Sequence, residues 1–219
     1  MPTVLITGAS RGLGKGFAEH YTAAGWRVIS TARNPDGLVG EALPLDVTSD
    51  ASVQSLVDSL AGEPIDLLLN NAGITGPRGT GVAGLDYAAW AEVLQVDAIA
   101  PVRVAAALAD NVAQSDRKLM VFISSIMGSI TQTSSSDSIF YRSAKACLNQ
   151  AVNVMSNDLK SRGIASVLFH PGWVRTDMGG AGAAIDVTTS IRGMTNVIER
   201  LGIDDNGRFI NYDGFDIPW

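Results

Sequence analysis

Cysteine is almost absent from this sequence of 219 residues, since Cys147 is the only one. A single cysteine cannot form an intrachain disulfide or a cysteine-rich metal site, so a disulfide-stapled secreted scaffold is excluded. Cys147 falls within an expected buried helix, where a small core residue is the simpler interpretation than a redox group. Histidine is also scarce: His20 and His170 occur, without a His-x-x-x-His or Glu-x-x-His pair. No catalytic metal is expected. For His170, which precedes Pro171, a structural role is favoured over a role at a site.

Long apolar runs are missing as well, because none reaches the ~18 residues that a membrane-spanning helix needs. Met1 leads directly into an expected strand at Thr3, which leaves no room for a signal peptide. The net charge of −6 is opposite to that of a nucleic-acid-binding surface. The sequence therefore predicts a cytoplasmic protein without nucleic-acid or membrane partners. Its length and aliphatic content fit one domain, residues 1–219.

Short apolar runs alternate with helical patterns along the chain. Strands are expected at residues 3–7, 27–31, 42–45, 65–70, 119–124, 165–169 and 208–210. Helices are expected at residues 12–24, 50–61, 86–113, 138–162 and 187–201. Helices between strands imply right-handed crossovers and a parallel sheet covered on both faces. The sequence thus predicts an α/β fold, a single Rossmann-type doubly wound sheet of about seven mainly parallel strands.

The helix ends and the loops carry further expectations. Asp50 and Asp137 are candidate N-caps, and Gly163 is a candidate C-cap. Residues 73–84 are rich in Gly and Pro and should form a loop. Residues 129–138 are rich in Ser and Thr, and this loop either is solvated or contacts substrate. The long helices at 86–113 and 138–162 could form the two-fold interface of a homodimer.

A glycine-rich loop follows the first expected strand. Gly8, Gly12 and Gly14 form Gly-x-x-x-Gly-x-Gly, and a helical pattern begins directly after them. Strand, glycine loop and helix in this order aim helix N–H groups at a pyrophosphate. The pattern is neither Gly-x-Gly-x-x-Gly, because position 17 is Phe, nor a Walker A loop, because Gly16 follows Lys15. An ordinary strand–helix turn is the alternative.

Tyr141 and Lys145 are spaced to share one face of a helix. A cation beside a phenol stabilises the phenolate, so the pKa of Tyr141 is expected below its usual ~10. Such a tyrosine is a general acid that exchanges a proton near neutral pH. The alternative is an exposed helix face with a solvated lysine.

Together these motifs resemble those of the short-chain dehydrogenases/reductases. The matching stretches are residues 7–14, 46–47, 70–73, 124–125, 141–145 and 171–176, in the order of the family and over nearly the whole chain. Pro-Gly-Trp-Val-Arg-Thr-Asp-Met, which begins at Pro171, and the closing residues 213–219 are similar to the C-factor-like and small carbonyl-reductase branch.

The resemblance implies an NAD(P)-dependent oxidoreductase that transfers a hydride between nicotinamide and a small carbonyl or alcohol substrate. Tyr141 would donate a proton to the carbonyl oxygen, Ser125 would hydrogen-bond to that oxygen, and Lys145 would bind the nicotinamide ribose. Ser124 competes with Ser125 for this assignment. The cofactor-binding residues would be Gly8, Ser10, Arg11, Gly12, Leu13, Gly14, Arg33, Asp46, Val47, Asn71, Ala72, Gly73, Tyr141, Lys145, Pro171, Gly172, Val174 and Thr176.

The second expected strand ends near Arg33, with no carboxylate at the point where one would meet the ribose 2′-OH of NAD. Arg33 and Arg11 could instead pair with a 2′-phosphate, which suits the planar guanidinium. NADP, bound as NADPH, is therefore the expected cofactor, and NAD is the less favoured one.

The resemblance breaks at Asp97, where the family usually has an asparagine that supports a proton relay to the lysine. Aspartate keeps the acceptor but lacks the amide donor. Its charge could pair with Lys145 and cancel the field on Tyr141, or it could face solvent or cap the helix. We count Asp97 among the catalytic candidates. It also supports a second hypothesis, a C-factor-like dinucleotide-binding regulatory or signalling protein with little turnover. A structural interaction module fits the glycine loop poorly.

Overall fold

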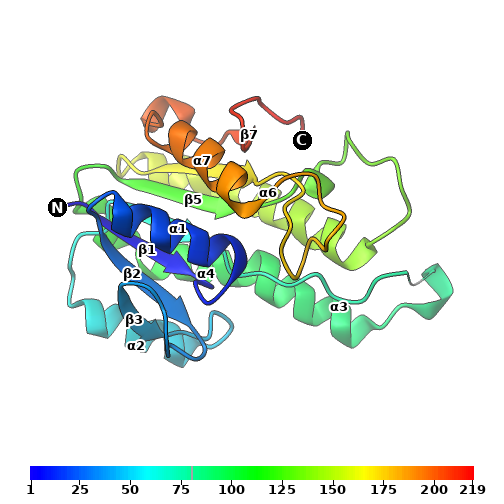
Figure 1. Ribbon diagram of the computed structural model, residues 1–219, viewed down its shortest axis with the longest axis horizontal. Coiled ribbons are helices and arrows are strands. Elements are labelled where there is room, and N and C mark those ends of the chain that lie inside the picture. Colours follow the sequence, from blue (N-terminus) through cyan, green and yellow to red (C-terminus); the bar gives the residue numbers. More distant parts are fainter. Residues whose placement is uncertain (80) are drawn as a thin grey trace.

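The computed structural model describes residues 1–79 and 81–219 and has three layers, a sheet between two layers of helices (Figure 1). The seven strands lie in the order β3-β2-β1-β4-β5-β6-β7, and all neighbouring strands are parallel. They are β1 Thr3–Thr7, β2 Arg27–Ala32, β3 Glu41–Pro44, β4 Leu67–Asn70, β5 Leu119–Ile123, β6 Ala165–His170 and β7 Phe209–Asn211. The predicted fold class is confirmed.

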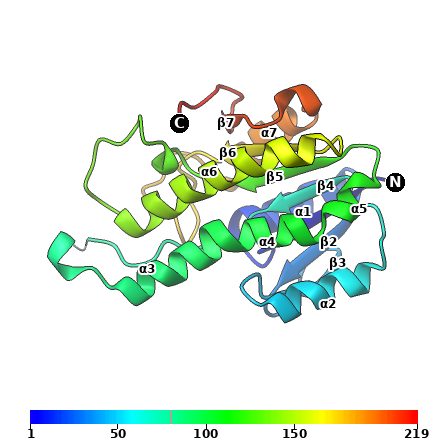
Figure 2. The same ribbon diagram turned by 180° about the vertical axis from the view of Figure 1, so that it is seen from behind.

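Helices cover both faces of the sheet. Helices α1 and α7 lie on the face seen in Figure 1, and α2, α4 and α6 lie on the face seen in Figure 2. The α-helices are α1 Gly12–Ala23, α2 Asp50–Leu60, α3 Tyr87–Leu94, α4 Ala100–Ala107, α5 Ala109–Ala113, α6 Ile139–Lys160 and α7 Val187–Ile198. Short turns are η1 Val82–Gly84, η3 Ile126–Gly128 and η4 Ile203–Asp205. In the described part of the chain, no helix is both long and apolar enough to cross a bilayer.

The central strands are mainly apolar because they contribute side chains to two cores, one on each face of the sheet. In β1, Leu5 packs into the cluster beneath α2, α4 and α6, whereas Val4 and Ile6 pack into the cluster beneath α1 and α7. Alternate strand residues point to opposite faces. All three side chains are fully buried, and each contributes roughly 1.5–3 kcal/mol to folding.

Two expected N-caps are wrong by one residue. Ser49, rather than Asp50, caps α2, and its side chain accepts a hydrogen bond from the backbone N–H of Ser52. Ser138, rather than Asp137, precedes α6, and its φ of 60° places it in the left-handed region. Ser49 is the N-cap because its hydroxyl can reach the N–H groups of the first turn, while Asp50 is already helical.

Two expectations on α6 also fail. The helix is capped by Ser161, and Gly163 follows with a φ of 75°, so this glycine completes the turn after the helix rather than capping it. Cys147 is exposed and is no core residue. It lies two positions, about 200° around the helix, from the buried Lys145.

The helix expected at residues 86–113 is interrupted. A π-helical turn, η2 Gln95–Ile99, separates α3 from α4, and Leu108 separates α4 from α5. Such single π-turns often occur at functional sites. Here the turn carries the buried Asp97. Residues 73–84 form the expected loop apart from η1, and residue 80 lies outside the described residues.

Candidate active site

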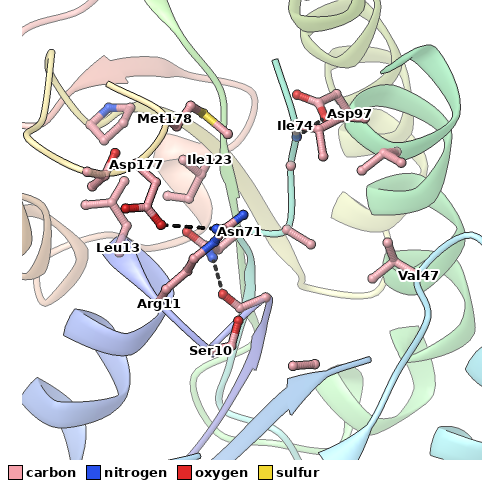
Figure 3. Close-up of a pocket in the computed structure, with 18 of the residues that line it drawn as sticks. Ser10, Arg11, Leu13, Val47, Asn71, Ile74, Asp97, Ile123, Asp177 and Met178 are labelled. Atoms are coloured by element: carbon pink, nitrogen blue, oxygen red, sulfur yellow. Dashed lines mark hydrogen bonds and ion pairs between the residues drawn. The ribbon is translucent and has the colours of Figure 1, made fainter. Parts of the chain in front are cut away.

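A cleft of about 710 Å³ lies at the carboxyl edge of the sheet (Figure 3). Parallel strands end at the same edge, so the loops after β1, β3, β4, β5 and β6 meet there. Most residues expected at the site line this cleft: Gly8, Ser10, Arg11, Gly12, Leu13, Arg33, Asp46, Val47, Asn71, Ala72, Gly73, Asp97, Tyr141, Lys145, Pro171 and Thr176. The cleft therefore unites motifs that are far apart in the sequence.

Four expected residues do not line it. Gly14 lies beneath the glycine loop, where a Cβ would stand 2.2 Å from the carbonyl oxygen of Gly8. Val174 is buried and pairs with the chain that returns towards α7. Gly172 lines a second, smaller cavity, and Ser125 is buried and is not among the lining residues of either cavity. Gly14 and Val174 are thus closely packed against other parts of the chain.

The glycine loop is held in place by Asn71. Its side-chain amide donates to the carbonyl oxygens of Thr7 at 3.0 Å and Gly8 at 3.1 Å. Gly8 has a φ of 69°, and a Cβ there would approach Ala72 Cα at 2.9 Å, so only glycine fits. Helix α1 begins at Gly12, and no side chain of the described residues caps it. Its first-turn N–H groups are therefore available to a phosphate, which fits a dinucleotide.

Charged groups surround the mouth of the cleft. Arg33 lines it at the end of β2, and the Arg11 guanidinium contacts the Asp177 carboxylate at 3.1 Å (Figure 3). The carboxylate of Asp46 accepts hydrogen bonds from the hydroxyl and N–H of Thr48, and these bonds lower the pKa of Asp46. Asp177 directly follows the family motif 171–176 but was not among the expected site residues.

Lys145 and Tyr141 share a wall of the cleft, as their spacing predicts. The Lys145 Nζ atom lies 5.5 Å from the centre of the Tyr141 ring. It donates to the carbonyl oxygen of Ile123 at 3.0 Å and contacts Asp97 Oδ2 at 3.1 Å. Lys145 is 4% exposed and Asp97 is fully buried, so the alternative of a solvated lysine is wrong.

Asp97 is directed inward by the π-helical turn and faces the cleft (Figure 3). Its Oδ1 atom accepts a hydrogen bond from the N–H of Ile74 at 2.7 Å. Its Oδ2 atom lies beside Lys145 as an ionic contact without the alignment of a hydrogen bond. The expected pairing with Lys145 is confirmed, and the solvent-facing and capping alternatives are wrong. The carboxylate in turn raises the pKa of Lys145 against the effect of burial.

The expected lowering of the Tyr141 pKa is wrong. Burial raises the pKa of this phenol above its usual value; the Lys145 ammonium opposes that effect, and the Asp97 carboxylate adds to it. Helical spacing predicts the neighbouring cation but neither the burial nor the second charge. Tyr141 is therefore protonated at neutral pH, in the form that donates a proton.

The two neighbouring serines have different surroundings. The Ser124 hydroxyl donates to Asn149 Oδ1 at 2.5 Å within the buried interior. The Ser125 oxygen accepts from the N–H of Met127 at 3.1 Å, and a hydrogen bond with Ser125 lowers the pKa of Tyr141. Asn149, one turn after Lys145, was not identified from the sequence. The geometry favours Ser125 as the partner of Tyr141.

His170 lines the second cavity, outside the cleft. Burial lowers its pKa to about 4, and the charge of Asp213 opposes this shift. Its Nδ1 atom is buried without a hydrogen-bond partner. Among the described residues, no group of three His, Cys, Asp or Glu side chains could hold a metal ion.

The buried His170 predicts an acid-sensitive stability. Its pKa is about 4 in the folded protein and about 6.5 in the unfolded chain, so the unfolded state binds more protons between these values. The free energy of unfolding should fall by on the order of 3 kcal/mol as the pH drops from 6.5 to about 4. Urea titrations of the wild type and of His170→Phe check this. The variant should lose less stability over that range, and equal losses would contradict the assignment.

Comparison with known proteins gives consistent matches. A sequence model of the short chain dehydrogenase family matches residues 2–184. The chain is 40% identical over 156 residues to the C-signal of Myxococcus xanthus, covering 71% of this chain and 93% of that protein. The solved structure of the carbonyl reductase Sniffer of D. melanogaster superposes with a TM-score of 0.93 at 30% identity, covering 100% of both chains. A carbonyl reductase from Pseudomonas aeruginosa in complex with NADP gives a TM-score of 0.88 at 33% identity, also over 100% of both chains.

Proposed function

The chain belongs to the short-chain dehydrogenase/reductase family of oxidoreductases, and from this premise we propose that it is an NADP-dependent carbonyl reductase. One observation carries the proposal: the protonated Tyr141, with Lys145 beneath its ring, lies in the wall of a cleft whose other end is a glycine loop. This arrangement supports a proton donor in the same cleft as a helix terminus that suits a phosphate. The carbonyl reductases with similar structures, one of them solved with NADP, support the same assignment.

The residues present fit a dinucleotide. The loop 8–14 and the free first-turn N–H groups of α1 would hold the pyrophosphate, and Arg33 with Arg11 would meet the 2′-phosphate. Asp46 and Val47 would flank the adenine. Residues 71–73, Pro171 and Thr176 would line the nicotinamide end. Bound NADPH supplies the hydride for the carbonyl carbon.

The side chains of the protein supply the proton and stabilise the charge. Tyr141 gives its hydroxyl proton to the carbonyl oxygen as negative charge develops there, so the products are an alcohol and NADP⁺. The Ser125 hydroxyl hydrogen-bonds to the same oxygen. Lys145 already donates to Ile123 and contacts Asp97, which leaves one N–H for the ribose. Its ammonium opposes the effect of burial on the Tyr141 pKa.

The test is NADPH oxidation by the purified chain with a panel of aldehydes, ketones and quinones, beside a calorimetric titration with NADPH. Turnover with at least one carbonyl compound supports the proposal. Tight NADPH binding without any turnover would contradict it.

A second candidate is a dinucleotide-binding regulatory protein with little turnover. The 40% identity to C-signal favours it, and so does Asp97 beside Lys145, because its charge weakens the field that would activate Tyr141. The presence of Ser125, Tyr141 and Lys145 together weighs against it, since a pure sensor does not need a proton donor. The same two measurements separate the candidates.

We expect a preference for NADPH over NADH of roughly ten- to a hundredfold in kcat/KM, the size of one or two charged hydrogen bonds. Arg33→Ala should remove most of this preference, because it should weaken NADPH binding and leave NADH binding unchanged. Asp177→Asn should strengthen NADPH binding, because Asp177 holds Arg11. Titrations with both cofactors measure these effects.

Arg192→Ala is the matched control, since this exposed arginine of α7 does not line the cleft. It removes the same charge and should leave both cofactor affinities unchanged. Equal or better kcat/KM with NADH in the wild type would contradict the cofactor assignment.

A further inference from the structure

Asn149 lies in helix α6, one turn after Lys145 and two turns after Tyr141. Residues four apart on a helix share a face, so α6 carries the phenol, the ammonium and this amide in one row. Asn149 is 3% exposed and is not among the residues that line the cleft. Both the oxygen and the nitrogen of its amide are hydrogen-bonded, which fixes the orientation of the side chain.

The two partners of this amide lie on either side of Ser125 in the chain. The Ser124 hydroxyl donates to Asn149 Oδ1 at 2.5 Å, and Asn149 Nδ2 donates to the carbonyl oxygen of Gly128 at 3.3 Å. The N–H of Gly128 in turn donates to the carbonyl oxygen of Ser125 at 2.8 Å. Asn149 is thus linked to Ser125 from both directions, through the residue before it and through the turn η3 after it.

Gly128 brings the turn η3 into direct contact with α6. A Cβ at Gly128 would lie 2.8 Å from the carbonyl carbon and the Cβ of Lys145, and 3.0 Å from Asn149 Nδ2. Only glycine therefore fits without a shift of the helix backbone. The loop that contains Ser125 is packed on the same stretch of α6 that carries the proton donor.

These hydrogen bonds also distinguish the two neighbouring serines. The Ser124 proton is used in the bond to Asn149, so it is not available to a carbonyl oxygen while that bond exists. The Ser125 oxygen accepts from the N–H of Met127, which leaves the hydroxyl proton of Ser125 free to donate. Ser125 also hydrogen-bonds with Tyr141, as the effect on the pKa of that phenol shows.

We propose that Asn149 is a positioning residue for the reaction: it holds Ser124 and Gly128 and thereby fixes the Ser125 hydroxyl beside Tyr141, where the two groups meet the carbonyl oxygen. The proposal rests on the carbonyl-reductase function proposed above. A positioning role requires that Asn149 affects the reaction only through Ser125. A merely structural role would reduce the amount of folded protein, whatever residue stands at position 125.

The test is a double-mutant cycle between Asn149→Ala and Ser125→Ala. Asn149→Ala should reduce kcat by ~10–10²-fold, the effect of displacing a reacting group by about 1 Å, and should leave the NADPH dissociation constant unchanged. In the Ser125→Ala background the same substitution should change kcat by less than about twofold, because the hydroxyl that it positions is already gone. An Asn149→Ala enzyme with the wild-type kcat would overturn the proposal.

Asn111→Ala is the matched control. This asparagine of α5 is also 3% exposed, its amide donates to the carbonyl oxygen of Glu63 at 2.8 Å, and it does not line the cleft. Its replacement should lower the stability to urea and keep the wild-type kcat of the folded enzyme. A loss of kcat equal to that of Asn149→Ala would show a general effect of losing a buried amide and would overturn the positioning role.

Ser124→Ala is the second variant and replaces Asn149→Ala in the cycle if that protein does not fold. It removes a single hydroxyl from the same link, so its loss of kcat should be smaller and should also disappear in the Ser125→Ala background. A loss that multiplies with that of Ser125→Ala, for either Ser124→Ala or Asn149→Ala, would mean that the residue does not act through Ser125.

A readout that needs no turnover separates this proposal from the proposed function. The chain has four tyrosines, and the NMR signal of Tyr141 Cζ in ¹³C-labelled protein is assigned by its loss in Tyr141→Phe. That signal should move in Asn149→Ala towards its position in Ser125→Ala, and it should not move in Asn111→Ala. If the wild type reduces no carbonyl compound, this movement supports the positioning role while the proposed function fails. An unmoved signal in Asn149→Ala overturns the positioning role.

Discussion

Tyr141→Phe should reduce kcat by ~10²–10⁴-fold on any carbonyl compound that the wild type reduces, because it deletes the proposed general acid. The ring remains over Lys145, so packing is conserved. The NADPH dissociation constant should stay within about twofold, since the phenol hydroxyl is not a phosphate ligand. Steady-state kinetics and calorimetry measure the two quantities separately.

Tyr87→Phe is the matched control, because it removes a phenol hydroxyl from a side chain that is 73% exposed and outside the cleft. It should keep the wild-type rate. A Tyr141→Phe enzyme that retained more than about a tenth of the rate would mean that another group donates the proton. A loss of NADPH binding in parallel with the rate would point to misfolding of the site instead.

The residues at the carboxyl edge of the sheet could be predicted, because their position follows from strand periodicity alone. Once residues 3–7, 119–124 and 165–169 are identified as parallel strands, Gly8, Ser125 and Pro171 must lie at one edge. The glycine loop could also be predicted, and the structure explains two of its glycines, since a Cβ at Gly8 or Gly14 would lie within 3 Å of backbone atoms. The homodimer interface on the long helices and the cytoplasmic location stay predictions.

The features of the site that could not be predicted from the sequence depend on tertiary contacts. The π-helical turn that directs Asp97 inward replaces what reads as one regular helix, and the N–H of Ile74 that holds its carboxylate comes from a loop 23 residues earlier. The expected direction of the Tyr141 pKa shift was wrong for the same reason, since a four-residue spacing shows the neighbouring cation but not the burial of the phenol. The cavity at His170 needs the segment after β7, which no motif connects to the cleft.

The charge of the buried Asp97 fixes the direction of a second large effect, a change in the pH dependence of the reaction. Its carboxylate lies 3.1 Å from the Lys145 ammonium and raises the Tyr141 pKa, so it keeps the phenol protonated to higher pH. In the wild type, the reduction rate should therefore stay flat through neutral pH and fall only in the alkaline range, where Tyr141 ionises. Oxidation of the corresponding alcohol, which needs the phenolate, should rise over the same alkaline range.

Asp97→Asn removes the negative charge and can keep the bond from Ile74 through the amide oxygen. The apparent pKa in both pH–rate profiles should move to lower pH, and the alcohol oxidation rate near neutral pH should rise several-fold, because one pKa unit corresponds to about a tenfold change in phenolate. The amide also restores a donor for a proton relay, so reduction below the new pKa should be equal to or faster than in the wild type.

The same substitution leaves the Lys145 ammonium buried without its counter-ion, and removing one partner of a buried pair costs roughly 3–5 kcal/mol. Asp97→Asn should thus be markedly less stable to urea even where it is the faster enzyme. Asp204→Asn, which removes a charge from an exposed position in η4, should change neither the stability nor the profiles. Superimposable pH profiles for Asp97→Asn and wild type, with only stability lost, would make Asp97 a structural counter-ion. A profile shifted to lower pH would identify it as the residue that sets the pH at which this site gives up its proton.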